Sequence, residues 1–301
     1  MGFLKSLGKR RRTRKIIGDR RMLHLPDDLS SPDTLAVYSG RRREDIWTAL
    51  FLLHSLQHSF PDCRHLLICR EDDSELAGTL QWIPDTVTYS DAPGTAASLA
   101  VERMTERSIL FHPYPEMDGE TASFIASTGA PVCVSTSADP VVNVSVRVGK
   151  LPLPERLYRM CEILGMSPDR DWSPSVPASY VEGAASILAP VSGRALPYIA
   201  ATTAAAGILE KRRAEIPVRM VIVEGKRREI PEVSRGIMAA IVGGASAAVT
   251  TDPGLWLKAR ALGVPAVGLD RNDRFPDWGD AAARTEEDFI DRWTDLLRRG
   301  W

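Results

Sequence analysis

The sequence predicts an α/β protein built from two doubly wound, Rossmann-like domains that face a cleft. Its 301 residues leave room for two domains of ~150 residues each. Short apolar runs alternate with helical runs, which is typical of parallel sheets covered on both faces. A segment rich in proline and without periodicity, residues 167–179, divides this pattern into two blocks and is expected to be a linker. In such folds ligands bind beyond the carboxyl ends of the strands.

The composition is that of an ordinary globular protein, with 44% apolar and 26% charged residues. No run of 18 or more apolar residues and no signal-peptide core is present, so we expect a cytoplasmic protein. The four cysteines form no CxxC pair, and the five histidines show no metal-ligand spacing. We therefore expect no metal and no cofactor, and free thiols that are mostly buried.

The first 29 residues are expected to form a basic, flexible tail. Residues 1–21 carry a net charge of +8, whereas the rest of the chain carries −9. Phe3, Leu4 and Leu7 precede the basic run, and such a segment can bind an anionic membrane surface. A solvated, disordered arm is the equally weighted alternative. Nucleic-acid binding is not favoured, because the rest of the chain is acidic and has no stripe of basic and aromatic residues.

The first domain is expected to span residues 30–166. Its apolar runs predict strands, and its longer periodic runs predict helices. The strands are expected at 34–39, 65–69, 108–112 and 131–135, and the helices at 45–59, 96–106, 119–127 and 154–164.

The second domain is expected to span residues 180–284 and to be followed by a C-terminal helix in 285–301 that packs back on the first domain. The same alternation of short and long apolar runs defines its elements. The strands are expected at 185–189, 218–223, 247–250 and 266–269, and the helices at 196–211, 231–242, 254–262 and 286–299.

The first strand runs into Arg41, Arg42 and Arg43, and Asp45 then opens a helix. An aspartate at this point can be a helix cap, which typically stabilises by ~1 kcal/mol. It can also be a general base that takes a proton from an acceptor hydroxyl. The three arginines could hold an anionic acceptor or could form a solvated loop.

The second block carries a similar junction at Asp252-Pro253-Gly254. Such a tripeptide is an ordinary turn, but it can also open a helix whose N-terminus binds a phosphate. Lys226 follows the strand expected at 218–223, where it could face the cleft or lie in a solvated loop. His112 ends its strand and is a candidate for the acceptor site.

Several motifs together resemble glycosyltransferase family 9, the family of bacterial heptosyltransferases. The run Asp45-Ile46-Trp47-Thr48-Ala49-Leu50 and the later Phe60-Pro61 are similar to the first helix of that family and to its Phe-Pro signature. Thr251-Asp252-Pro253-Gly254 and the following Ala261-Leu262-Gly263-Val264-Pro265 are similar to its nucleotide-sugar signature. The likeness covers about residues 34–270 and includes Phe111-His112 with Ser123, Leu153–Gly165, and Ile187–Pro190 with Gly193-Arg194 and Pro197.

The resemblance implies a GT-B architecture and sugar transfer with inversion. A nucleotide-sugar would be bound by the second domain, and the acceptor, an envelope glycolipid or saccharide, by the first. It further implies that Asp45 is the base and that Arg194 holds the departing diphosphate together with the helix that follows Asp252. The protein would then act at the inner face of the membrane.

Departures from the family pattern define a second hypothesis. Glu44 stands where the family has glycine, Arg194 where a lysine is expected, Pro253 where it has threonine, and Leu257 where it has histidine. Leu257 and Pro253 each remove a polar group that would meet the donor. The alternative is therefore a catalytically inactive GT-B-fold binding or scaffold protein at the inner membrane surface.

Overall fold

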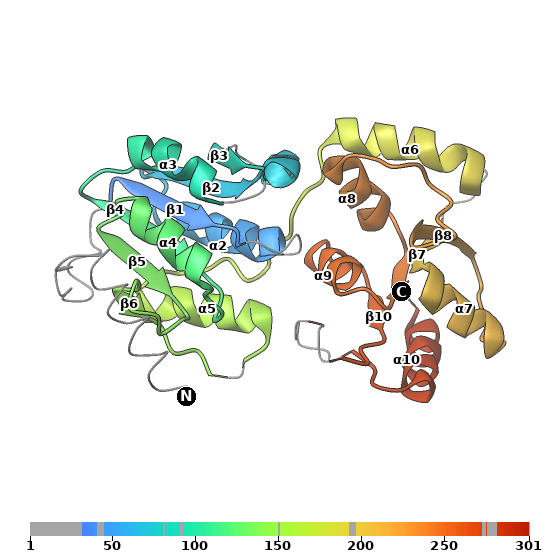
Figure 1. Ribbon diagram of the computed structural model, residues 1–301. Helices are drawn as coiled ribbons and strands as arrows, with labels where there is room; N and C mark the ends of the chain where they lie inside the picture. Colours follow the sequence, from blue (N-terminus) through green and yellow to red (C-terminus); the bar gives the residue numbers. More distant parts are fainter. Residues whose placement is uncertain are drawn as a thin grey trace. The chain divides into compact units, whose positions relative to one another are not determined.

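The computed structural model divides into two compact units, of which the first ends at Trp172 and the second begins at Ser173; Gly78–Gln81 belongs to the second unit (Figure 1). The division lies within the segment 167–179 expected as a linker. The structure describes residues 32–40, 45–80, 82, 84–90, 93–149, 151–192, 197–272, 275 and 282–300.

The first unit holds a six-stranded parallel sheet in the order β3-β2-β1-β4-β5-β6. Helices α3 and α4 pack on the face that carries Tyr38, and α2 and α5, which contact each other, cover the other face (Figure 1). The strands are β1 (Thr34–Tyr38), β2 (Arg64–Arg70), β3 (Asp85–Tyr89), β4 (Ser108–His112), β5 (Val132–Ser135) and β6 (Val144–Ser145). The helices are α2 (Asp45–Ser59), α3 (Ala97–Arg103), α4 (Gly119–Ser127) and α5 (Leu153–Ile163), with 3-10 helices η2 (Glu71–Thr79) and η3 (Pro93–Ala96).

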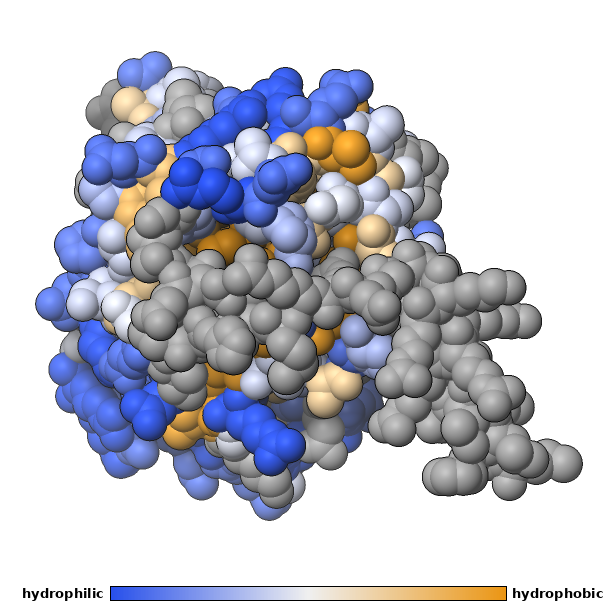
Figure 2. Space-filling view, turned by 90° about the vertical axis from the view of Figure 1, so that its left-hand side faces the viewer, coloured by the Kyte–Doolittle hydropathy of each residue, from blue (hydrophilic) through white to orange (hydrophobic). Residues whose placement is uncertain are grey.

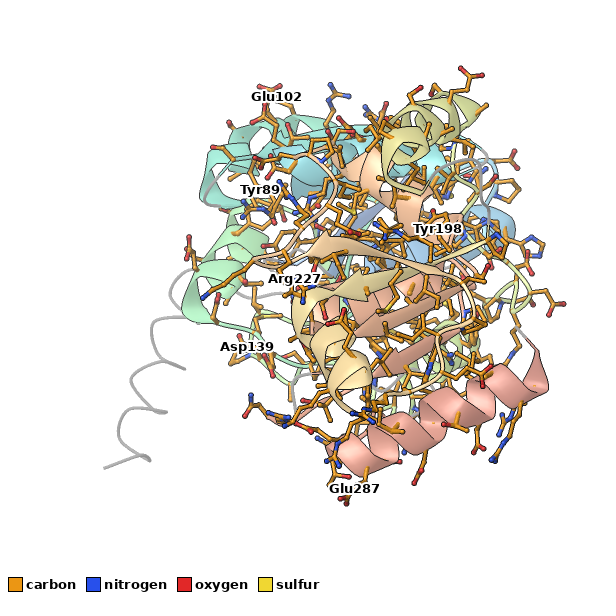
Figure 3. The ribbon with its side chains drawn as sticks, turned by 90° about the vertical axis from the view of Figure 1, so that its right-hand side faces the viewer. Tyr89, Glu102, Asp139, Tyr198, Arg227 and Glu287 are labelled. Atoms are coloured by element: carbon orange, nitrogen blue, oxygen red, sulfur yellow. The ribbon has the colours of Figure 1, made fainter. Side chains whose placement is uncertain are left out.

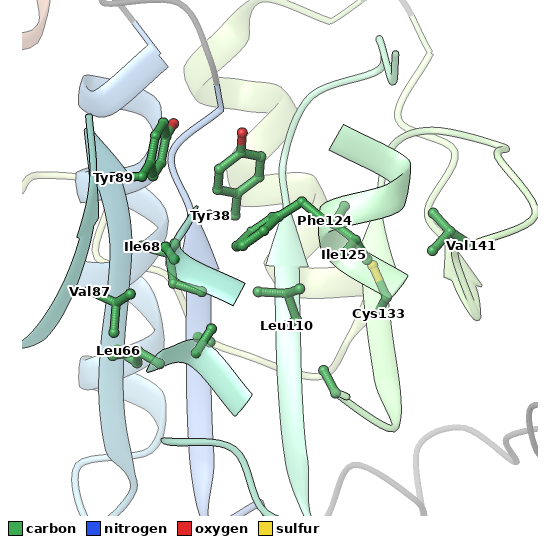
Figure 4. Close-up of a cluster of buried hydrophobic side chains, with 14 of the residues drawn as sticks. Tyr38, Leu66, Ile68, Val87, Tyr89, Leu110, Phe124, Ile125, Cys133 and Val141 are labelled. Atoms are coloured by element: carbon green, nitrogen blue, oxygen red, sulfur yellow. The ribbon is translucent and has the colours of Figure 1, made fainter. Parts of the chain in front are cut away.

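The core under α3 and α4 is a continuous cluster of buried side chains (Figure 4). Tyr38 lies at its centre, with its ring centroid 5.0 Å from that of Phe124 and 6.1 Å from that of Tyr89. Tyr38 and Tyr89 are the last residues of β1 and β3, so the core extends to the carboxyl edge of the sheet. The outer face of this unit is mainly hydrophilic with separate small apolar patches (Figure 2).

The second unit holds a four-stranded parallel sheet in the order β10-β9-β7-β8. Helices α6, α8 and α9 share one buried cluster with the sheet, and α7 and α10 share another on the opposite face. The strands are β7 (Tyr198–Thr202), β8 (Arg219–Glu224), β9 (Ala247–Thr250) and β10 (Ala266–Gly268). The helices are α6 (Ala178–Ser192), α7 (Thr203–Lys211), α8 (Arg235–Gly243), α9 (Pro253–Ala261) and α10 (Glu286–Arg299).

Most expected elements are confirmed, but the elements predicted at the start of the second unit are wrong. The strand expected at 185–189 lies inside α6, because a short apolar run in a buried helix has the same pattern as a buried strand. The helix expected at 196–211 is instead β7 followed by α7. Its alanines suggested a helix, whereas the Tyr, Ile and Thr residues between them fit a buried strand. The short strands β3 and β6 were not expected.

The C-terminal helix α10 packs on the second unit, so the expected packing on the first domain is wrong. Phe289 and Trp293 are fully buried against β7 and α7, in the same cluster as Ile199 and Ala205. The Trp293 indole Nε1 donates a hydrogen bond to the Glu215 backbone oxygen at 2.9 Å. The helix therefore completes the core of the sheet it follows. Within the described residues, no helix is both long and apolar enough to cross a membrane.

Replacing Trp293 with alanine should lower the free energy of unfolding by about 3–5 kcal/mol, the usual cost of truncating a buried tryptophan. Urea unfolding followed by far-UV circular dichroism measures this. The control is Arg298→Ala on the same helix, whose side chain is 75% exposed and whose loss should cost under about 0.5 kcal/mol. Equal costs for the two variants would contradict the packing of α10 described here.

Candidate functional site

In the first unit, Asp45 lies directly against the backbone that leaves β1. Gly40 has a φ of +80°, and a Cβ added there would lie 2.6 Å from Asp45 Oδ2 and 2.9 Å from Tyr114 Cε2. A side chain at position 40 is therefore excluded both by the backbone conformation and by the Asp45 carboxylate. Asp45 is the first residue of α2 and is half-buried.

Two tyrosines hold this junction in place. The Tyr89 hydroxyl donates a hydrogen bond to the Gly40 backbone oxygen, and the Tyr114 hydroxyl donates to the backbone oxygen of Asp45. Burial raises the pKa of Tyr114 well above its ordinary value, and the Asp45 charge adds to that effect. Tyr114 therefore stays neutral and remains a hydrogen-bond donor over the physiological pH range.

His112 is an interior residue and is not placed to contact an acceptor directly. Its side chain is 2% exposed, stacked on Tyr38 with ring centroids 5.8 Å apart, and its Nδ1 lies 3.3 Å from Ser135 Oγ. Burial lowers the pKa of His112 to about 4, so the ring is neutral at pH 7. A role for His112 at the acceptor site stays a prediction. Arg41, Arg42 and Arg43 lie outside the described residues.

In the second unit, threonine hydroxyls gather where β7 and β9 end. Thr202 caps α7, because its Oγ1 accepts a hydrogen bond from Ala205 N. The same oxygen accepts a second hydrogen bond from Thr251 N at 3.2 Å. Thr203 Oγ1 donates to the Glu224 backbone oxygen at 3.2 Å and accepts from Arg227 N at 3.0 Å. These bonds join the ends of β7, β8 and β9 into one polar edge, with Arg227 in the turn after β8 (Figure 3).

Asp252 caps the helix that the Asp-Pro-Gly sequence predicted. Its side chain accepts a hydrogen bond from Leu255 N at 2.8 Å, and Pro253 occupies the first turn of α9. A Cβ on Gly254 would lie 3.1 Å from Asp252 Oδ1, so a larger residue would crowd the cap. The helices α7 and α9 thus both begin at the same polar edge, and the N–H groups of a helix N-terminus favour an anion.

Glu224, the last residue of β8, was not predicted as a site residue from the sequence. Its pKa is raised, chiefly by burial and further by the neighbouring Asp252 carboxylate. The opposing charges of Lys258 and Arg235 lower the pKa of Glu224. Lys258 is only 7% exposed, so this unit buries a lysine next to a pair of acids.

In the sequence, the feature that could have indicated Glu224 as a site residue is its position at the end of a strand and before a glycine. Gly225 has a φ of +101°, and a Cβ added there would lie 2.7 Å from Thr203 Oγ1. The glycine lets the chain turn tightly over the threonine cluster. Lys226 follows in this turn and is exposed.

Two further positions belong to the expected donor side, and their roles stay predictions. Arg194 lies outside the described residues, and it precedes β7, the first strand of this unit, whereas the resemblance placed a basic turn after that strand. The segment after β7 has no basic residue before Lys211. Leu257 is 2% exposed, so this position of α9 belongs to the interior. Among the described residues, no group of three or more His, Cys, Asp or Glu side chains could hold a metal ion.

The unfolding free energy should fall as the pH drops from 6.5 toward 4 because of His112. Its pKa is about 4 in the folded chain and 6.5 ordinarily, so the unfolded chain takes up a proton first as the pH falls. The contribution is fully present above pH 6.5, and its loss amounts to about 3 kcal/mol at most.

Urea unfolding at a series of pH values compares the wild type with His112→Phe. The wild type should lose stability relative to the variant across this window, while the exposed His58→Gln change should leave the wild-type profile in place. Parallel profiles for the wild type and His112→Phe would show that His112 does not titrate in this way.

No family model matches the sequence, and no curated protein matches it. Solved structures match over most of the chain. A glycosyl transferase of family 9 from Veillonella parvula has a TM-score of 0.64 at 14% identity, with 89% of each chain covered. The Escherichia coli heptosyltransferase WaaC, solved with ADP-2-deoxy-2-fluoro heptose, has a TM-score of 0.58 at 12% identity, covering 89% of this chain and 100% of that one.

The Escherichia coli ADP-heptose lipopolysaccharide heptosyltransferase II has a TM-score of 0.60 at 12% identity, covering 88% of this chain and 99% of that one. At such identities the likeness shows the fold. The predicted fold is thereby confirmed: this chain has the GT-B fold of glycosyltransferases, and its structural neighbours include family 9 heptosyltransferases.

Proposed function

We propose that this protein transfers a sugar from a nucleotide-sugar donor to a hydroxyl of a cell-envelope glycolipid or saccharide. The observation that carries the proposal is the polar edge of the second sheet, where Glu224, Asp252 and Lys258 lie beside the first turns of α7 and α9. An acid with a raised pKa, here Glu224, beside a buried lysine at the carboxyl ends of parallel strands is typical of a ligand site. Neighbours of the same fold are solved with ADP or an ADP-sugar.

The donor diphosphate would bind at the starts of α7 and α9. Backbone N–H groups and threonine hydroxyls can donate to its oxygens, and Lys258 supplies a positive charge nearby. Pro253 has no N–H group, so α9 offers one donor fewer than a helix that begins with another residue. Glu224 can accept hydrogen bonds from ribose hydroxyls.

In the reaction, Asp45 would take the proton from the acceptor hydroxyl. The acceptor oxygen forms a bond to the anomeric carbon while the bond from that carbon to the diphosphate breaks, which inverts the configuration. The helix N-termini and Lys258 stabilise the charge that develops on the leaving diphosphate, a role that needs no metal ion. Tyr114 and Gly40 hold the start of α2 and so fix the position of the base.

A second candidate is a nucleotide-binding protein of the same fold without transferase activity. Two observations favour it: the segment after β7 lacks a basic turn, and Leu257 is buried where the family has a histidine. Both hypotheses predict nucleotide binding at the second unit. Only the first predicts turnover that depends on Asp45.

Asp45→Asn should abolish transfer and leave nucleoside diphosphate binding within about twofold of wild type, because an amide of similar shape cannot take the proton. Glu224→Gln should weaken ADP, UDP or GDP binding about tenfold or more, because one of the two oxygens that accept from the ribose hydroxyls becomes an NH2 group, which cannot accept. Isothermal titration measures binding, and release of the diphosphate from a sugar nucleotide with an envelope extract as acceptor measures turnover.

Binding without turnover in the wild type would select the second candidate. Wild-type turnover in Asp45→Asn would show that Asp45 only stabilises the start of α2. Unchanged nucleotide affinity in Glu224→Gln would remove Glu224 from the donor site.

We also propose that residues 1–21 bring the protein to the anionic inner surface of the membrane. These residues lie outside the described part of the chain, and their charge of +8 against −9 for the remainder carries the proposal. Each basic residue near an anionic surface contributes about 1 kcal/mol, and exposed charges are screened within about 8 Å at physiological ionic strength.

Co-sedimentation with vesicles rich in anionic lipid should retain the full chain at low salt and release it at high salt. A chain shortened to begin at Pro26 should not bind and should keep the wild-type melting temperature. Equal binding by both chains would refute the role of the tail, and a large drop in melting temperature would place the tail in the folded core.

A further inference from the structure

A groove of about 530 Å³ runs along α7 in the second unit, a volume within the range of small-molecule sites. One wall is a stripe of α7 formed by Ala204, Gly207, Ile208 and Lys211, which share a helix face because they lie three or four residues apart. The opposite wall is the segment that follows β10. Helices α7 and α10 lie on this face of the sheet (Figure 3).

The groove opens onto the polar edge described above. Thr251, which follows β9, lines the groove, and its N–H donates to Thr202 Oγ1. Leu269, which follows β10, lines it as well. Since neighbouring strands are about 4.8 Å apart, β10 and the Glu224 end of β8 are separated by roughly 10–15 Å in the order β10-β9-β7-β8. One elongated ligand can therefore reach from Glu224 across the threonines into the groove.

The charges that line the groove are balanced. Lys211 and Arg271 stand against Asp270 and Glu286. Arg271 Nη2 donates to Glu286 Oε1 at 2.5 Å, and Asp270 accepts from the backbone N–H of Asn272 at 3.1 Å. Such a lining selects neither an anion nor a cation. It offers donors and acceptors together, which suits a neutral ligand with many hydroxyl groups.

Apolar surface completes the groove. Ile208, Leu269 and Phe275 contribute to its walls, and the Phe275 ring packs at 5.7 Å from Trp256. Sugars present apolar C–H faces between their hydroxyls, so a mixed wall of this kind matches them. The diphosphate would instead remain with the N-termini of α7 and α9, where backbone N–H groups and the buried Lys258 favour an anion.

We infer that this groove binds the sugar of the donor, with the nucleoside held at Glu224. The inference rests on the proposed function and adds to it the place of the transferred sugar and the residues that select it. The stripe on α7 and the segment after β10 would then decide which sugar nucleotide is accepted.

The test fills the groove at Gly207. A Cβ at this position meets nothing within 4 Å, and glycine is a poor helix residue, so Gly207→Met should fold at least as well as the wild type. Gly207→Ala is the matched control, because it makes the same backbone change and adds only a methyl group. Isothermal titration compares UDP with UDP-glucose, ADP with ADP-glucose and GDP with GDP-mannose.

Gly207→Met should lower the affinity for the sugar nucleotide that the wild type binds by about tenfold or more. The affinity for the matching nucleoside diphosphate should stay within about twofold of wild type. Gly207→Ala should leave both near wild type. Equal weakening of the two ligands would place the nucleoside in the groove, and no change in either would leave the groove outside the site; both outcomes overturn the inference while the proposed function stands. If no nucleotide binds the wild type, the proposed function fails and this inference fails with it.

Discussion

The closeness of the Glu224 and Asp252 carboxyl groups is the constraint around which the second unit arranges its polar edge. Such a pair is unfavourable unless a proton or a positive charge offsets it. Burial raises the pKa of Glu224, and the positive charge of Lys258 opposes that shift. Asp252 also caps α9, so the end of β8 lies near the start of a helix two strands away in the sheet.

This constraint explains the small residues around it. Gly225 and Gly254 leave room for the turn over Thr203 and for the Asp252 cap. Thr202 and Thr251 join the neighbouring strand ends through their hydroxyl and backbone groups. The edge is therefore polar, ordered by its own hydrogen bonds, and able to exchange some of them for a ligand that carries the same groups.

In the first unit, neutral hydroxyl groups hold the junction between a strand and a helix. Asp45 lies against Gly40, and the two hydroxyls of Tyr89 and Tyr114 hold the backbone on either side. The tyrosines bond backbone oxygens, and the Asp45 side chain stays half-exposed at the start of α2. The two units therefore divide the proposed chemistry, with a base on one sheet and charge compensation on the other.

The sequence was sufficient for elements whose signal is local. The helices α2 and α10 were predicted with their observed bounds, and the Asp252 cap follows from the Asp-Pro-Gly order. The prediction near α6 was wrong because its apolar run fits either a buried strand or a buried helix. Glu224, Lys258 and Tyr114 could not be predicted as site residues, since each depends on which strands and helices become neighbours in the folded unit.

The most direct test of the account is hydrogen–deuterium exchange of the full chain with and without saturating ADP, UDP or GDP. The account predicts slower exchange at the start of α7, in the turn after β8 and at the start of α9, since these are the backbone segments of the polar edge. Exchange elsewhere in the second sheet should change little. Protection confined to the first unit, or no protection by any of the three nucleotides, would contradict a donor site at Glu224 and Asp252.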